Sequence, residues 1–220
     1  MKDTVKVDQS SMKNGSLDFR QIVAELKAEM TMLKPGHRLV EMPLCEHFGV
    51  KRDKIRRALR QLEHEGFVRI IPNVGAVVAD LSQKDIEQTY DLLGVLEGLA
   101  ARVVTPSITK ENLEHMHGIL KKMQSSDGAA FFDWNREFHS FLTSLCENER
   151  LIKLADNLRD HVRNFYFKFS YHPYRKKAND EHLKIVELIE CMYSEKVEQL
   201  IRIHYLNSKK LLLKQVNKSL

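Results

Sequence analysis

The chain has 220 residues, of which 43% are hydrophobic and 30% are charged, with only 9 Gly and 5 Pro. This composition is typical of an ordered, water-soluble protein and excludes collagen-like, mucin-like and linker sequences. The length predicts two compact domains, and the net charge of +5 permits an anionic partner. Because the sequence lacks both a signal-peptide core and an apolar run of membrane-spanning length, we expect a cytoplasmic protein that does not bind a membrane.

Residues 1–16 are polar and show no periodic apolar pattern, which predicts a flexible tail before the first domain. Apolar residues then recur at helical spacing over three successive stretches. The three predicted helices run from Asp18 to about Met30, from Met42 or Pro43 to Gly49, and from about Arg52 to Glu65. Between the first two helices, Arg38–Val40 is predicted to form a short extended segment.

The third predicted helix concentrates the basic charge. The ten residues from Lys51 to Arg60 hold six basic residues and one acidic residue, a net charge of 6 − 1 = +5. The basic residues are Lys51, Arg52, Lys54, Arg56, Arg57 and Arg60. Arg52, Arg56 and Arg60 recur every fourth residue, which aligns them on one ridge away from the apolar side of the helix. Such a ridge either faces solvent or meets an anionic partner.

Two β-prone runs follow, Phe67–Ile71 and Ala76–Ala79, around the turn Pro72–Gly75. Three helices followed by such a hairpin are the pattern of a winged helix-turn-helix, in which the third helix enters the DNA major groove. The order of these elements favours nucleic-acid binding over a merely solvated basic helix. We therefore assign residues 17–80 to a DNA-binding domain.

From residue 81 onward the β-prone patterns end and the sequence shows one helical pattern after another. Ser82 with Asp85 three residues later resembles a capping box, and the helix that it opens is expected to end before Pro106. Further helices are predicted at about 109–124, 128–146, 148–170, 178–193 and 195–217. The fold class is therefore mainly α, with an N-terminal winged helix-turn-helix followed by an all-α bundle over residues 81–220.

Several segments, in the right order, resemble the GntR family of bacterial transcription regulators, specifically its FadR-type branch with a C-terminal FCD domain. Pro35–Glu41 resembles that family's PGxRLxE segment, while Phe48–Arg52 and Ile55–Glu63 resemble its LGVSR...VREALRRLE core. Glu65–Val68 and Pro72–Val78 match its wing. The resemblance implies a DNA-binding regulator whose helical domain binds an effector and forms a homodimer.

The resemblance assigns base contacts to Arg52 and Arg56, and a DNA contact to the wing tip at Gly75. An arginine on an exposed ridge can donate two parallel hydrogen bonds to guanine O6 and N7, which agrees with that assignment. The remaining basic candidates, as phosphate contacts or solvated charges, are Lys54, Arg57 and Arg60, with Lys51 at the start of the helix. This chain departs from the family pattern at three places: Lys51 replaces the usual Ser or Thr, Asp53-Lys54 replaces Thr-Pro, and Val74 replaces an Arg. We therefore expect a different operator sequence.

Asn135 and His139 are spaced four residues apart and therefore project from one helix face. His182 and His204 lie on later helices, whose antiparallel packing would bring the imidazoles together. Three histidines with an oxygen donor can hold a first-row metal ion. Periodicity alone does not show this convergence, and each of the ten histidines taken alone is more often a surface or core residue.

The FCD pattern has Asp or Asn before a Phe-His pair, then Glu-His, then a last His. This chain matches it at Asn135, His139, His182 and His204. The resemblance therefore implies a divalent metal ion, with zinc as the first choice and nickel or manganese as alternatives. Because Asn135 is neutral where many relatives carry Asp, we expect a weaker bond to the metal. A metal with an open coordination position could bind a small carboxylate effector.

Relatives often place an arginine four residues before the Glu of an R..LE segment, where it holds an effector carboxylate. In this chain that position is Leu93, four residues before Glu97. Arg163 and Tyr166 on a later helix are candidate substitutes for binding the effector. They could equally border the bundle without a role in binding.

These patterns together predict a sequence-specific transcriptional regulator, expected to be a repressor, that binds a palindromic operator as a homodimer and responds to a small organic acid. We do not expect an enzyme. One alternative is a metal-dependent helical hydrolase acting on a phosphorylated substrate, but no Gly-rich phosphate loop or acid cluster supports it. Another is an architectural DNA-binding protein, which would leave the long C-terminal domain without a purpose.

Overall fold

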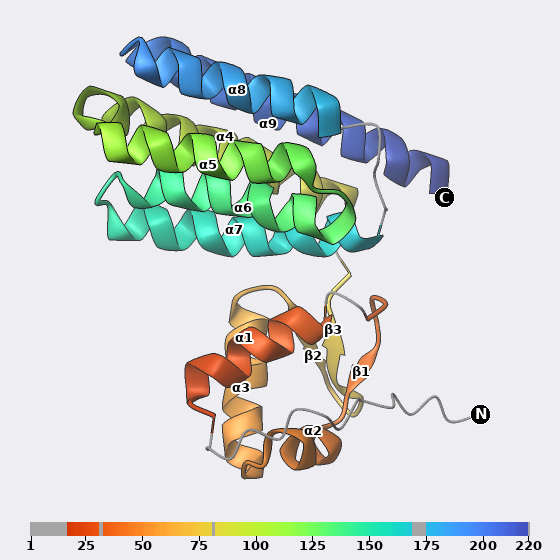
Figure 1. The fold of residues 1–220 in the computed structure, drawn as a ribbon. Helices are drawn as coiled ribbons and strands as arrows, with labels where there is room; N and C mark the ends of the chain where they lie inside the picture. The colour runs from red at the N-terminus through yellow and green to blue at the C-terminus, as the bar shows by residue number, and fades with distance from the viewer. Residues whose placement is uncertain (1–16, 31–32, 81, 169–174, 220) are drawn as a thin grey trace. The chain divides into compact units, whose positions relative to one another are not determined.

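The structure is a computed structural model that describes residues 17–30, 33–80, 82–168 and 175–219, except for the side chains of residues 163–168 and 218–219. The chain forms two compact units, Met1–Ala79 and Asp80–Leu220, which Figure 1 draws as ribbons. Each unit has its own hydrophobic core, as expected of a separate domain.

The first unit consists of three helices and a small antiparallel sheet. Its elements are α1 (Phe19–Met30), β1 (Arg38–Leu39), α2 (Glu41–Phe48), α3 (Arg52–His64), β2 (Val68–Ile71) and β3 (Gly75–Val78). β2 and β3 form the hairpin that the sequence predicts, with Val68 opposite Val78 and Ile71 opposite Gly75. β1 pairs with the other edge of β3. The extended segment was predictable, but its pairing was not, because its partner strand lies far along the chain.

The core of the first unit determines which side of α3 is exposed. Ile22 and Leu26 of α1 and Ile55 and Leu62 of α3 are fully buried together with the inner face of the sheet. Burial of a side chain of this size stabilises a fold by roughly 1.5–3 kcal/mol. The opposite side of α3 carries the charged residues, so packing of the apolar stripe directs the arginine ridge to the surface.

The second unit is a bundle of helices. Its elements are α4 (Gln83–Val104), the 3₁₀ helix η1 (Thr105–Ser107), α5 (Lys110–Ser125), α6 (Gly128–Ser144), α7 (Glu149–Lys168), α8 (Arg175–Glu190) and α9 (Ser194–Ser219). The expected capping box is present, since Asp85 N–H donates to the Ser82 hydroxyl and Ser82 N–H donates to the Asp85 carboxylate. α8 begins at Arg175, earlier than predicted, because its first turn is polar and shows no apolar periodicity.

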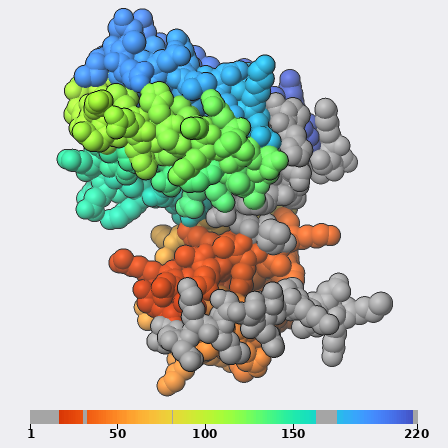
Figure 2. Space-filling model, in the orientation of Figure 1, coloured from red at the N-terminus to blue at the C-terminus, as the bar shows by residue number. Residues whose placement is uncertain are grey.

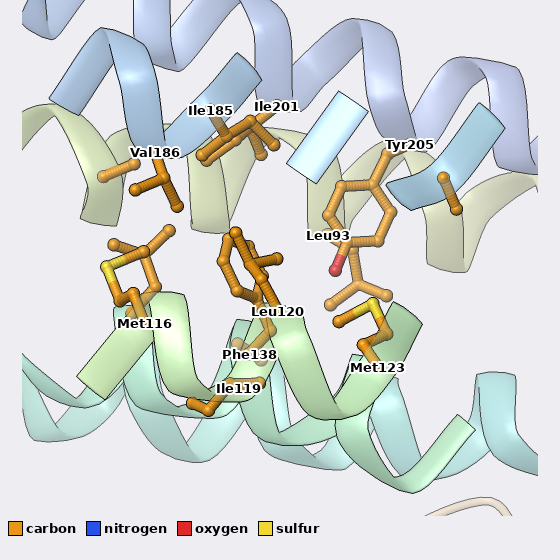
Figure 3. Close-up of a cluster of buried hydrophobic side chains, with 14 of the residues drawn as sticks. Leu93, Met116, Ile119, Leu120, Met123, Phe138, Ile185, Val186, Ile201 and Tyr205 are labelled. Atoms are coloured by element: carbon orange, nitrogen blue, oxygen red, sulfur yellow. The ribbon is translucent and has the colours of Figure 1, made fainter. Parts of the chain in front are cut away.

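Apolar side chains from several helices form the core of the second unit. Figure 3 shows Leu93, Phe138, Ile185 and Ile201, from α4, α6, α8 and α9, gathered between the helices. On the face drawn in Figure 2, side chains of α5 (green) and α8 (blue) lie next to each other. The two units together confirm the mainly α fold with an N-terminal winged helix-turn-helix. Within the described ranges, none of the helices combines the length and apolar character needed to span a bilayer.

Candidate metal centre and DNA-binding face

Three histidines from three helices meet in the second unit. His139 of α6, His182 of α8 and His204 of α9 are 2%, 0% and 3% exposed, and their candidate ligand nitrogens all lie within 4.8 Å of one another. His182 precedes the buried Ile185 by three residues, and His204 follows the buried Ile201 by three, which is the spacing of one helix face. The structure therefore brings together the three histidines that the sequence predicts.

The spacing of these nitrogens suits a single metal ion. His139 Nε2 and His182 Nε2 are 3.1 Å apart. Two nitrogen ligands that are each about 2.1 Å from one ion would be about 3.0 Å apart at a right angle and about 3.4 Å apart at the tetrahedral angle of zinc. The ring centroids of His182 and His204 are 4.6 Å apart, and those of His139 and His204 are 5.2 Å apart. This donor set fits a divalent first-row ion, for which imidazole is a preferred ligand.

Two carboxylates orient two of the histidines. Glu97 Oε2 lies 2.7 Å from His139 Nδ1, and Glu181 Oε2 lies 2.7 Å from His204 Nδ1. A carboxylate at Nδ1 favours the tautomer in which Nδ1 is protonated and the Nε2 lone pair can bind a metal. The Glu181 carboxylate is itself fixed by Asn207, whose Nδ2 donates a hydrogen bond to it at 2.7 Å. Metal-binding histidines almost always have such partners.

Burial keeps two of the imidazoles uncharged. Burial, assisted by the charges of His204 and His139, lowers the pKa of His182 well below its usual 6.5. Burial also lowers the pKa of His204, although its hydrogen bond to Glu181 acts in the opposite direction. His182 Nδ1 is buried and has no hydrogen-bond partner among the described residues. Because a neutral imidazole is the form that binds a metal ion, the electrostatics agree with the geometry.

A small cavity adjoins the histidines. It has a volume of about 50 Å³ and is lined by His139 and His204 together with residues of α4, α6 and α7, among them Leu93, Asn135 and Arg159. At roughly 15 Å³ for each water-sized volume, it accepts a ligand of a few non-hydrogen atoms. Asn135 lies half-buried in the cavity wall, one turn before His139. Its direct bond to a metal stays a prediction.

A buried ion pair connects the cavity wall to the histidines. Arg159 Nη1 donates hydrogen bonds to Glu97 and, at 3.0 Å, to the Thr143 hydroxyl, while Nη2 donates to Asp156 at 2.7 Å. Burial alone would raise the pKa of Glu97, but the charges of Arg159 and His139 outweigh it and lower that pKa to about 2. A single carboxylate therefore joins the arginine to the candidate metal ligand.

Sequence reasoning noted Glu97 but missed its partner Arg159. The two residues are 62 positions apart, so no local pattern pairs them. A signal was nevertheless present, because Glu97 follows Leu93 by four residues on the buried side of α4 and a buried charge requires a buried partner. Arg163 and Tyr166, the predicted effector contacts, belong to α7, but their side chains lie outside the described residues.

In the first unit, α3 exposes the predicted arginine ridge. Arg52 and Arg56 both donate from Nε to the carboxylate of Glu41, the first residue of α2, with Arg56 at 3.0 Å. Partial burial of Glu41 would raise the pKa of its carboxyl, but the hydrogen bonds from the two arginines outweigh it and lower that pKa. Arg60 and Lys51 are exposed. Two guanidinium groups of the ridge are thus held in place at the surface.

The remaining DNA-contact candidates have different surroundings. Lys54 Nζ donates to the Leu17 carbonyl at 2.7 Å, and the Arg57 guanidinium lies 4.9 Å from the centroid of the Phe19 ring. Both side chains therefore help to hold the start of α1 against α3, which the charge pattern alone did not reveal. Gly75 is exposed and begins β3 with a φ of 98°.

Two protein-family models match the chain. Residues 19–78 match the model described as bacterial regulatory proteins, gntR family, and residues 88–207 match the model of the FCD domain. The first match covers the elements from α1 to β3, and the second begins within α4 and ends within α9. The second match contains the histidine cluster and every residue that lines the cavity except Ser208.

Curated relatives cover most of the chain at low identity. The uncharacterized HTH-type transcriptional regulator YdhC of Bacillus subtilis (strain 168) is 26% identical, over 78% of this chain and 80% of that protein. The Nta operon transcriptional regulator of Aminobacter aminovorans is 26% identical, over 71% and 75%. The HTH-type transcriptional repressor RspR of Escherichia coli (strain K12) is 24% identical, over 79% and 78%.

Solved structures share the fold. E. coli McbR/YncC has a TM-score of 0.79 at 17% identity, covering 90% of this chain and 98% of that one. A putative GntR regulator from Rhodococcus sp. RHA1 has a TM-score of 0.74 at 20% identity, covering 89% and 97%. These likenesses support the arrangement of elements within the fold and carry no assignment of ligand.

Proposed function

We propose that this chain, which belongs to the GntR family of bacterial regulatory proteins and carries an FCD domain, is a repressor controlled by a small organic acid. Its family and its curated relatives are transcriptional regulators, so it is a regulator and not an enzyme, and the hydrolase alternative is set aside. The name of the E. coli relative RspR, a transcriptional repressor, supports the repressor role. The observation that carries effector control is the cluster of three buried histidines beside a cavity.

We expect His139, His182 and His204 to hold a divalent metal ion, zinc before nickel or manganese, with Asn135 as a candidate fourth ligand. When bound, the ion would supply an electrophilic position for a carboxylate oxygen of the effector. The carboxylates of Glu97 and Glu181 keep their imidazoles oriented for this task. The volume of the cavity favours a compact acid, and Arg163 and Tyr166 remain candidates for contacting it.

For DNA, we expect α3 to enter the major groove, with Arg52 and Arg56 contacting bases. Lys51 and Arg60 are exposed and suited to phosphate contacts, and Gly75 places the hairpin tip beside the duplex. Lys54 and Arg57 add positive charge to this face while packing against α1. A homodimer would present two such faces to a palindromic operator, and a bacterial protein that binds chromosomal DNA acts in the cytoplasm.

The experiment that tests DNA reading is selection from a random duplex library with purified full-length protein at a stated salt concentration. We expect the wild type to enrich one short palindrome that a double variant, Arg52→Ala with Arg56→Ala, does not enrich. The matched control is Lys176→Ala with Lys210→Ala, which removes two exposed positive charges from the second unit. Enrichment of the same palindrome by the double variant would contradict the assignment.

A further inference from the structure

One face of α4 is apolar and exposed. Leu93 is fully buried on the bundle side of α4, whereas Leu92, Val95 and Val103 are 53%, 45% and 53% exposed. Leu99 is half-buried and lies on the same side, because it is four residues from both Val95 and Val103. Leu92, Val95, Leu99 and Val103, which we name the α4 stripe, therefore follow one another along a single helix face.

Helix α9 packs on a different side of α4. That side is marked by two glycines: a Cβ added at Gly94 would lie 3.4 Å from the Tyr205 side chain, and one at Gly98 would lie 3.2 Å from Glu198. Among the described residues of the second unit, none covers the exposed residues of the α4 stripe. Single exposed apolar residues are common on monomers, but a continuous stripe of them marks an interaction site.

The α4 stripe is nearly symmetric about its own middle. The midpoint between Leu92 and Val103 falls between residues 97 and 98, and the midpoint between Val95 and Leu99 is residue 97. A two-fold interface needs this property, because residue i of one copy contacts residue j of the other and the reverse. Two antiparallel α4 helices would place Leu92 against Val103 of the partner subunit, and Val95 against Leu99 of the partner subunit.

Charges beside the stripe favour the same arrangement. Asp91 and Arg102 both lie on the flank of α4 that faces α9, where they contact Lys209 and Glu198 respectively. In an antiparallel pair of α4 helices, Asp91 of one copy comes near Arg102 of the partner subunit. A parallel two-fold pair would instead place these flanks on opposite sides of the interface, so Asp91 could not approach Arg102 of the partner subunit.

We propose that the α4 stripe is the surface through which two copies of this chain associate, with their α4 helices antiparallel about a two-fold axis near residue 97. The proposal rests on the proposed function in one respect, since a palindromic operator calls for a two-fold dimer. The apolar residues supply the attraction, and the flanking charges set the direction and register of the pair.

Cysteine cross-linking tests the register directly. In a full-length background with Cys45, Cys146 and Cys191 changed to Ser, we would combine Leu92→Cys with Val103→Cys and compare the double variant with each single variant. Antiparallel pairing places residue 92 beside residue 103 of the partner subunit, but it separates the two copies of residue 92 by about 16 Å along the helix. A bismaleimide too short to span that distance should link the double variant into dimers and leave both single variants unlinked.

A second variant keeps the test independent of the introduced cysteines. Val95→Glu should shift the protein to monomers in sedimentation, whereas Leu154→Glu, at a position 57% exposed on α7, should not. A dimeric Val95→Glu protein, or efficient linking of Leu92→Cys to itself, would overturn the proposed interface. A wild type that is dimeric but never linked through α4 would overturn only this interface, whereas a monomeric wild type would overturn the homodimer of the proposed function.

A second inference concerns the first unit and depends on a different observation. The Glu41 carboxylate of α2 accepts hydrogen bonds from the Nε atoms of Arg52 and Arg56 on α3. Among the described residues, these are the hydrogen bonds that the two guanidinium groups make. Because Nε is the inner nitrogen, the contact leaves both terminal Nη groups of each arginine at the surface, where they form the fork that reads guanine O6 and N7.

Holding an arginine before it meets DNA changes the cost of binding. A long, exposed arginine loses rotamer freedom when it forms a specific contact, and a side chain already fixed loses less. The negative charge of Glu41 also opposes the approach of phosphate groups, and that effect weakens binding to every DNA sequence equally. The first effect favours the right sequence and increases discrimination between sequences. The second weakens binding to all sequences and leaves the ratio of affinities unchanged.

We infer that Glu41 is a positioning residue for base reading by Arg52 and Arg56, an inference that rests on the proposed DNA-binding function. The test compares Glu41→Gln with Glu46→Gln, which removes an equal charge from an exposed position on the same helix. The probes are the palindrome selected by the wild type and a scrambled duplex of the same length, measured at one salt concentration.

We expect Glu46→Gln to bind both duplexes slightly more tightly and to keep the ratio of the two affinities. Glu41→Gln should tighten binding to the scrambled duplex in the same way, but it should lower the affinity ratio about tenfold. Equal ratios for the two variants would overturn the inference and leave Glu41 as a charge alone. A wild type that selects no sequence would instead contradict the proposed function itself.

Discussion

The two units each contain a glutamate that binds arginine, and the surroundings of the two carboxylates differ. Glu41 and Arg52 are 26% and 57% exposed at their side chains, so water screens their attraction. Glu97 and Arg159 are 1% and 5% exposed. The exposed pair leaves guanidinium groups available to an external partner, whereas the buried pair is committed to holding the cavity wall and His139. The same two residue types thus serve recognition in one unit and internal organisation in the other.

Removing one partner from each ion pair should reveal the largest difference between the two units, which is a difference in the free energy of unfolding. Arg159→Ala removes the guanidinium group that compensates the buried charge of Glu97, so we expect it to lower the free energy of unfolding by about 3–5 kcal/mol. Glu41→Ala should change that free energy by less than about 1 kcal/mol. Urea unfolding of metal-free protein measures both. Arg136→Ala, which breaks the partly exposed pair with Asp160, is the control for the second unit. If Arg136→Ala lowered the free energy of unfolding as much as Arg159→Ala, burial of the ion pair would not explain the difference.

Acid should act on the buried pair at a defined pH. The folded-state pKa of Glu97 is about 2 against a usual value of 4.5, so its contribution is complete above pH 4.5 and is lost as the pH falls toward 2. The shift corresponds to about 3 kcal/mol. Burial lowers the pKa of His182 below 6.5. Its contribution to the free energy of unfolding is therefore complete above pH 6.5 and is also lost as the pH falls below that value.

Unfolding of metal-free protein followed between pH 7 and pH 3 would separate these two groups. Glu97→Gln should reduce the loss below pH 4.5 by about the contribution of Glu97 and retain the part that begins at pH 6.5, since His182 is unchanged. Should this variant instead follow the wild-type curve below pH 4.5, the stabilising role of the ionised Glu97 would be refuted.

Metal addition should stabilise only the unit that contains the histidine cluster. Zinc added to chelator-treated wild type at about 100 times the dissociation constant should stabilise the folded state by about 2.7 kcal/mol and raise the Tm. His182→Ala should abolish the shift. His117→Ala, at an exposed histidine paired with Glu190, should retain it, and a shift that survives in His182→Ala would place the metal elsewhere.

Asn135→Asp should produce the smallest of these changes. If Asn135 is a ligand, a carboxylate there should bind the ion more strongly than the neutral amide and increase zinc affinity about tenfold, which is about 1.4 kcal/mol. Competition with a coloured chelator measures the affinity. Asp133→Asn, a change of the same type at an exposed position of α6, is the control. Equal affinities for Asn135→Asp and the wild type would remove Asn135 from the set of ligands.

The sequence predicts the exposed arginine ridge of the first unit better than the buried histidine site of the second. Arg52, Arg56 and Arg60 belong to one helix, so their common face follows from the helical repeat. Their contact with Glu41 does not follow, because it depends on the packing of α2 against α3. The strand order of the sheet was missed for the same reason, as β1 pairs across a long separation.

In the second unit, the residues of the site come from helices far apart in the chain. The resemblance identified His139, His182 and His204, but their convergence depends on how three helices pack. Arg159 was missed because nothing near it in the sequence indicates that its charge is buried against Glu97. From the sequence alone, one can see that Glu97 is a charged residue on the apolar side of a helix. This position indicates that a buried partner of opposite charge exists, but it does not identify Arg159 as that partner.

The central claim is that the histidine cluster of the second unit controls DNA binding by the first. We would measure the affinity of zinc-loaded protein for its selected palindrome by fluorescence anisotropy, with and without a panel of two- to four-carbon carboxylic acids. At least one acid should weaken binding of the wild type and of His117→Ala by five-fold or more, while leaving His182→Ala unchanged. If every acid acts equally on the wild type and on His182→Ala, the cluster does not control DNA binding.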